Sequence, residues 1–182
     1  FSVIKLNAKI DYRKTLSKFS TFLFNNNEKK NNENMAYLRK ELVGSHKGLK
    51  KKFERTGNNF TLSKIYGDLL ECEFDQICGS NLNFKDYKLI IKEVNYLFIK
   101  NIPVLNKSIN DKIKRFIYLI DAIYEEKKIL SISSKIPFKK IFIESINDID
   151  FKRTYSRLNE IFSKRYISEN LEKFGKIYYN KY

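Results

Sequence analysis

Several residue types are scarce in this chain of 182 residues. It has no tryptophan, one methionine, one histidine, two prolines and two cysteines. Cys72 and Cys78 lie six residues apart, and together with His46 they are too few to complete a structural zinc site. We therefore expect no bound metal ion in this chain, and we expect both cysteines to be reduced, buried thiols of an intracellular protein.

Long apolar runs and a starting methionine are also absent. No stretch of about 18 or more apolar residues occurs, so the sequence predicts no transmembrane helix and leaves only peripheral membrane association open. The first residue is Phe1 and the single methionine is Met35, which suggests a piece of a longer protein.

Positive charge is abundant, with a formal net charge of +15. Such an excess often indicates binding to nucleic acids or anionic membranes. Here lysine is spread along the chain together with frequent asparagine and isoleucine, as an AT-rich genome would produce, so nucleic-acid binding is not favoured. Arginine is the more informative cation, because lysine cannot replace its planar, bidentate donor group. It occurs at seven positions: Arg13, Arg39, Arg55, Arg115, Arg153, Arg157 and Arg165.

Hydrophobic spacing and turn residues predict a mixed, helix-rich α/β chain. The polar run "NNNEKKNNEN" is expected to be a solvated loop insertion. In chain order we predict a strand over 1–7, a helix over 11–24, a polar loop over 25–34, a short helix over 35–43, a polar stretch to 59, two strands around Gly67 within 60–74, a helix over 85–98, a helix over 108–127, a strand over 129–133, a short helix from Pro137, a helix over 151–162 and a terminal helix through Leu171.

The clearest pattern lies at 108–137. Ser108 and Asp111 form a capping pattern ahead of apolar residues that share one helical face. A short strand pattern follows and ends at Pro137. A helix followed by a strand is the layout that adds one more parallel strand to a sheet.

Four blocks of the sequence resemble one family in their order and spacing. They are "DYR" at 11–13, "FDQICGSNLNFKDY" at 74–87, "RFIYLIDAIYEEKKILSISSKIP" at 115–137 and "FKRTYSRLNEI" at 151–161. Together they resemble the C-terminal part of the ZapE ATPase family, bacterial cell-division ATPases with mitochondrial relatives called "ATPase family gene one"-like proteins. The chain departs from the family pattern at Ile77, Glu125, Ser134 and Ile161, where the family has leucine, aspartate, alanine and methionine.

The resemblance implies the C-terminal part of one AAA-like P-loop ATPase domain, made of the last sheet strands and a helical lid. Its parts would be a strand and first lid helix (1–24), a polar insertion (25–59), a strand pair with helices and an added strand (60–163) and a terminal helix (164–182). It also implies ATP and Mg²⁺ as ligands. The sequence contains no G-x-x-x-x-G-K-[ST] loop, and we find no acidic strand end for magnesium. We therefore expect those parts upstream of Phe1, and this chain alone to be inactive.

Two arginines are candidates for phosphate contact. Arg153 and Arg157 lie four residues apart, so a helix places them on one face, where like charges repel by about 0.2–0.5 kcal/mol and favour an anionic partner. In the resemblance, related ATPases place an arginine that senses the γ-phosphate in this region. The alternative is an ion pair with Glu160. Both interpretations stay open, with Arg157 favoured as the catalytic and phosphate-binding residue and Arg153 beside it.

Three other charged residues receive weaker assignments. Arg13, near the start of the lid, is a further candidate for phosphate contact. Arg115 and Asp121 are interpreted as structural anchors of the 108–127 helix, because Asp121 has no second acid or nearby histidine for acid–base chemistry.

The leading hypothesis is a region of an ATP hydrolase that acts in cell division or protein quality control, in the bacterial cytoplasm or in mitochondria. Its partners would be proteins of that machinery, with a homo-oligomer also open. The alternatives are a basic nucleic-acid-binding module and a protein-interaction module without nucleotide.

Overall fold

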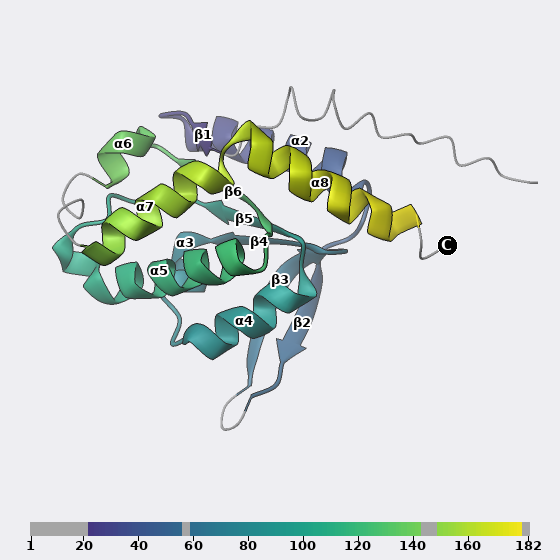
Figure 1. The fold of residues 1–182 in the computed structure, drawn as a ribbon, viewed down its shortest axis with the longest axis horizontal. Helices are drawn as coiled ribbons and strands as arrows, with labels where there is room; N and C mark the ends of the chain where they lie inside the picture. The colour runs from purple at the N-terminus through teal and green to yellow at the C-terminus, as the bar shows by residue number, and fades with distance from the viewer. Residues whose placement is uncertain (1–21, 56–58, 143–148, 180–182) are drawn as a thin grey trace, which may run out of the picture.

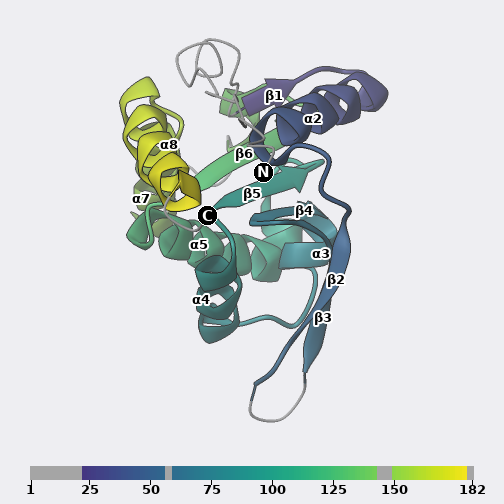
Figure 2. The same ribbon diagram turned by 90° about the vertical axis from the view of Figure 1, so that its right-hand side faces the viewer.

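The structure, a computed structural model, describes residues 22–55, 59–142 and 149–179. A sheet of six strands lies between two layers of helices (Figure 1, Figure 2). The strands are β1 (Phe22–Phe24), β2 (Leu49–Phe53), β3 (Phe60–Tyr66), β4 (Leu69–Glu73), β5 (Tyr96–Lys100) and β6 (Ile129–Ser134). The helices in the described ranges are α2 (Glu28–Val43), α3 (Phe74–Cys78), α4 (Phe84–Glu93), η1 (Lys107–Ile109), α5 (Asn110–Glu125), α6 (Phe138–Ile141), α7 (Ile149–Ile161) and α8 (Lys164–Tyr179).

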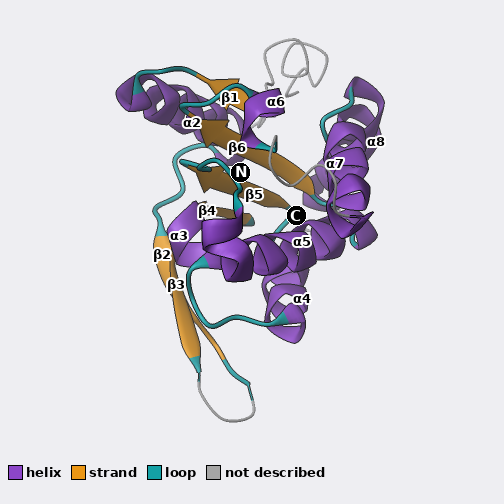
Figure 3. Cartoon of the chain, turned by 90° about the vertical axis from the view of Figure 1, so that its left-hand side faces the viewer, coloured by secondary structure: helices purple, strands orange, loops and turns teal. Residues whose placement is uncertain are grey.

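The strand order is β1-β6-β5-β4-β3-β2. β1, β6, β5 and β4 are parallel, whereas β3 and β2 run antiparallel to their neighbours. Figure 3 shows β2 and β3 at one edge of the sheet, with β1 at the other. The chain is thus a mixed α/β protein, as predicted.

Alternate residues of the central strands enter two separate cores. Leu70, Leu97 and Leu130 belong to the larger core, which contains apolar residues of α3, α4, α5 and α7. Leu69 and Phe98 belong to the smaller core, with residues of α2 and α8. Every residue of β5 and β6 is buried, as expected for strands that helices cover on both faces.

The helix–strand unit and the hairpin are confirmed. α5 and β6 occupy the predicted 108–133 stretch, and β6 pairs in parallel with β5. β3 and β4 form an antiparallel pair around Gly67, whose φ of 62° lies in the left-handed region that glycine tolerates best. The α7 and α8 helices match the two predicted helices of the tail.

The predicted polar loop at 25–34 is wrong. α2 begins at Glu28, and the Asn27 side chain caps it by accepting from the Lys29 amide. Only a narrow face of this helix is apolar. Met35 and Leu38 lie on that face and are buried in the smaller core. The predicted helix at 11–24 is also wrong at its end, because 22–24 form β1; its remainder and the predicted 1–7 strand lie outside the described residues.

Besides β1, two further strands were missed. The predicted 85–98 helix ends at Glu93 as α4, and 96–98 belong to β5, a continuous apolar run that periodicity cannot separate from a buried helix. β2 was assigned to a polar stretch because it is a lysine-rich edge strand, and lysine is common at exposed sheet edges. The predicted Ser108 cap does not form: the N-cap of α5 is Ile109, which makes no side-chain cap, and Asn106, whose side chain accepts from the Ser108 amide, caps the preceding η1 helix.

Candidate functional site

The two candidate arginines of α7 face α5. The Arg157 guanidinium forms an ion pair with the Asp121 carboxylate, and Arg153 Nη2 lies 3.4 Å from Asp121 Oδ2. Arg153 also lies 3.3 Å from Asp150 on its own helix. Asp121 therefore pairs with both arginines in the structure, and Asp150 is a second partner of Arg153.

Tyr124 completes the contact between the two helices. The Arg157 guanidinium carbon lies 5.0 Å from the centroid of the Tyr124 ring, a cation–π geometry. The Tyr124 hydroxyl donates to Glu160 Oε2 at 2.7 Å, and this hydrogen bond raises the pKa of Tyr124. Glu160, predicted as an alternative partner of Arg157, is thus engaged by Tyr124 in the structure.

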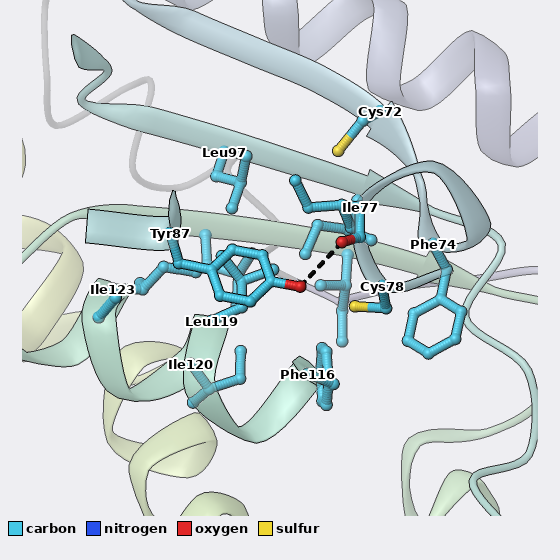
Figure 4. Close-up of a cluster of buried hydrophobic side chains, with 14 of the residues drawn as sticks. Cys72, Phe74, Ile77, Cys78, Tyr87, Leu97, Phe116, Leu119, Ile120 and Ile123 are labelled. Atoms are coloured by element: carbon cyan, nitrogen blue, oxygen red, sulfur yellow. Dashed lines mark hydrogen bonds between the residues drawn. The ribbon is translucent and has the colours of Figure 1, made fainter. Parts of the chain in front are cut away.

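Arg115 connects α5 to α3. Its Nη1 donates to the Cys78 carbonyl oxygen at 3.2 Å. The Tyr87 hydroxyl donates to the neighbouring Ile77 carbonyl at 2.9 Å, deep in the larger core (Figure 4). Arg115 and Tyr87 thus bind the end of α3 from two different helices.

The same region requires a glycine at position 79. A Cβ on Gly79 would lie 2.3 Å from the Asp75 carbonyl oxygen, so any side chain there would force the backbone to move. Burial raises the pKa of both the Cys72 and Cys78 thiols, which keeps them protonated and unreactive. The cysteine of the "ICG" block is therefore a packing residue.

Replacing Tyr87 with phenylalanine is expected to destabilise the protein by about 1–3 kcal/mol, because the buried Ile77 carbonyl would lose its donor. Urea unfolding followed by circular dichroism would measure the change. Tyr118→Phe is the matched control, since Tyr118 is 45% exposed, and we expect it to have little effect. Equal stability of the two variants would contradict this role for the Tyr87 hydroxyl.

Asp86 holds the start of α4. Its carboxylate accepts from the Asn83 amide at 2.8 Å, and the Asn83 side chain accepts from the Asp86 amide, which completes a capping box. Arg55 forms an ion pair with the same carboxylate, which is almost fully buried. The "DY" of the second block thus caps a helix with its acid and packs the core with its ring.

A second polar cluster was not found from the sequence. It lies at the carboxyl ends of β4 and β5, the edge of parallel sheets where ligands commonly bind. Lys100 Nζ lies 2.9 Å from Glu73 Oε1 and 3.3 Å from Glu71 Oε1. Burial alone would lower the pKa of Lys100, but hydrogen bonds and charge from the two glutamates raise it overall.

Asn101 connects this cluster to α2. Its side-chain amide donates to Glu73 Oε2 at 2.9 Å and to Glu28 Oε1 at 3.0 Å, while its own φ of 58° is rare for a residue other than glycine. An acid does stand at a strand end, since Glu73 ends β4, but Lys100 and Asn101 engage its carboxylate. The expectation that this chain has no such acid for magnesium stays a prediction. A weak signal was available, because Glu73 and Asn101 each follow a run of strand-forming residues.

Other predicted features are placed as follows. Arg13 lies outside the described residues. In the described ranges, no group of three or more histidine, cysteine, aspartate or glutamate side chains is placed to hold a metal ion. None of the helices described is long and apolar enough to cross a membrane.

Comparison with known proteins decides the family. The model of the AFG1-like ATPase family matches residues 1–170. The chain belongs to the AFG1-like ATPase family. This confirms the resemblance drawn from the four sequence blocks, and three of those blocks meet in the fold of this AFG1-like chain: Arg115 bonds Cys78, and Asp121 bonds Arg157.

Curated relatives of this AFG1-like chain come from animals, fungi and bacteria. The chain is 31% identical over 146 residues to an uncharacterized protein of Schizosaccharomyces pombe. This alignment covers 77% of the chain and 31% of the yeast protein. It is 24% identical over 169 residues to the cell division protein ZapE of Escherichia coli, covering 91% and 44% respectively. A stretch of 71 residues is 34% identical to lactation elevated protein 1 homolog B of Danio rerio, covering 39% and 14%.

The AFG1-like chain thus spans less than half the length of these relatives. No solved structure matches it.

Proposed function

We propose that this chain is the C-terminal part of an enzyme that binds and hydrolyses ATP with Mg²⁺. The observation that carries the proposal is the match to the AFG1-like ATPase family over residues 1–170. The 182 residues contain no phosphate-loop motif and cover 44% of ZapE, which supports placing the nucleotide-binding core elsewhere in the complete protein. The contribution of this chain would then be a lid and arginine contacts.

Arg157 is the residue we propose for contact with phosphate, with Arg153 and Arg13 as further candidates. The Arg157 side chain is 24% exposed and that of Arg153 is 49% exposed, so an anion can reach both without unfolding α7. Guanidinium groups match phosphate oxygens with paired hydrogen bonds. A phosphate would take the place that the Asp121 carboxylate occupies in this structure.

The cellular role is proposed from the relatives. ZapE of Escherichia coli is a cell division protein. We propose a corresponding role in cell division or protein quality control, in the bacterial cytoplasm or in mitochondria, with proteins of that machinery as partners.

Phosphate release from ATP tests this assignment. The complete protein is expected to hydrolyse ATP in a Mg²⁺-dependent manner, whereas the 182-residue chain alone is expected to show no turnover, because it has no phosphate loop. Circular dichroism of the short chain would establish that it is folded. ATP hydrolysis by the 182 residues alone, or no hydrolysis by the complete protein, would contradict the proposal.

A further inference from the structure

A hollow of about 440 Å³ opens on the side of the molecule where α2 ends. We call it the α2–β3 groove, and it is lined by Tyr37, Arg39, Lys40, Ser45, His46 and Tyr66. Among the described residues that line it there are three basic side chains and no acidic one. None of these residues belongs to the arginine site on α7 or to the four sequence blocks.

Two of the lining side chains, Arg39 and Tyr66, are fixed by contacts with residues beneath the groove. The Arg39 guanidinium lies 4.4 Å from the centroid of the Tyr66 ring and forms an ion pair with the buried Glu71 carboxylate. A Cβ on Gly48 would lie 2.8 Å from Tyr66 Cζ, so the backbone at that glycine packs directly against the ring. This part of the groove is therefore preformed and needs no partner to order it.

The rim of the groove offers residues that interfaces use. Tyr37 is 46% exposed, which is high for a large aromatic side chain. Tyrosine and arginine are the residue types that most often dominate binding at interfaces. A Cβ on Gly44 would meet nothing within 4 Å, so the groove is open at the turn that follows α2.

The charged side chains that line the groove are basic, although Arg39 is already paired with Glu71. Lys40 lines it and is exposed, and Lys47 and Lys50 follow on the exposed turn and the start of β2. Positive potential of this kind attracts acidic partners and increases their association rate. The open shape suits an extended segment that lies across the surface better than an enclosed small molecule.

We propose that the α2–β3 groove docks an acidic segment of a partner protein that carries an aromatic side chain. The acidic groups would meet Lys40 and its lysine neighbours, and the aromatic ring would pack between Tyr37 and Tyr66. The contact needs no nucleotide, so it is independent of the proposed ATPase activity.

A random copolymer of glutamate and tyrosine is a suitable probe, with fluorescence anisotropy on the complete protein as the measurement. Lys40→Glu and Tyr37→Ser are each expected to weaken binding at least about tenfold. Both residues are exposed, so both variants should stay folded. Lys40→Glu should lower the melting temperature only slightly, because Lys40 lies in the last turn of α2, where a basic side chain is favoured. Lys114→Glu makes the same charge change at an exposed position of α5, across the sheet from α2, and should weaken binding less than about twofold.

Three results would overturn the proposal. One is the absence of binding, and another is equal weakening by Lys40→Glu and Lys114→Glu, which would indicate only general attraction to a basic protein. The third is tighter binding of a single-stranded oligonucleotide that the same two groove variants weaken, which would make the groove a nucleic-acid site. Because ATP hydrolysis is not measured, failure here leaves the proposed function untouched.

Discussion

Replacing Arg157 with alanine in the complete protein is expected to lower kcat for ATP hydrolysis by about 10³-fold or more, if its guanidinium stabilises charge on the transferred phosphate. Arg153→Ala should have a smaller effect on kcat. The Arg153 side chain is more exposed than that of Arg157, and its contact with Asp121, at 3.4 Å, is the longer of the two. Steady-state phosphate release at saturating ATP measures both. Arg157→Lys should fail to restore the rate, since an ammonium lacks the paired donors.

Asp121→Asn separates the phosphate role from a structural one. It removes the charge that balances Arg157 in this structure but keeps the shape of the side chain. If Arg157 acts on phosphate, this variant should retain most of the activity. If Arg157 only fastens α7 to α5, Asp121→Asn should reproduce the loss and lower the melting temperature as well. Arg165→Ala is the control, because Arg165 is highly exposed and pairs with Glu169 on its own helix.

Replacing Phe116 with alanine is expected to destabilise the protein by about 3–5 kcal/mol. Its side chain is fully buried, and its ring lies 5.8 Å from that of Phe74, centroid to centroid. Figure 4 shows it beside Cys78, in the layer between α5 and α3. Truncation would leave a cavity where α5 and α3 meet, and chemical unfolding would measure its effect.

Tyr118→Ala is the matched control for Phe116. Both residues lie on α5, so the change in helix propensity is similar, but the Tyr118 side chain is 45% exposed. It should cost about 1 kcal/mol or less. A similar loss for both variants would mean that α5 contributes through its helical backbone rather than through the packing of its inner face.

Part of the fold was predictable because local signals agreed there. In α5, a buried stripe at helical spacing is followed by a short run that is buried throughout as β6, so helix and strand were both identified. α2 was identified only over 35–43 and β5 was missed, for opposite reasons. α2 is polar over most of its surface and depends on Met35 and Leu38 reaching the sheet, while β5 is apolar on both sides and so has no alternation to read.

The candidate site was predictable in residue identity but not in partnership. Arg153, Arg157 and Asp121 were selected from helical spacing and family resemblance, yet their mutual contact joins α5 to α7 across 32 or more residues of sequence. The cluster of Glu73, Lys100 and Asn101 brings together the ends of two strands. Neither set of contacts follows from spacing along the chain.

By itself, the sequence determined the α/β class, the α5–β6 unit, the hairpin at Gly67 and the family, because each depends on residue types at short spacing or on blocks in a set order. Only the tertiary structure decided that α2 extends back to Glu28, that 96–100 form β5 and that Asp121 pairs with both arginines. It also placed a basic aromatic groove where α2 ends. The physical reason is that burial and ion pairing depend on which distant segments the parallel sheet brings together.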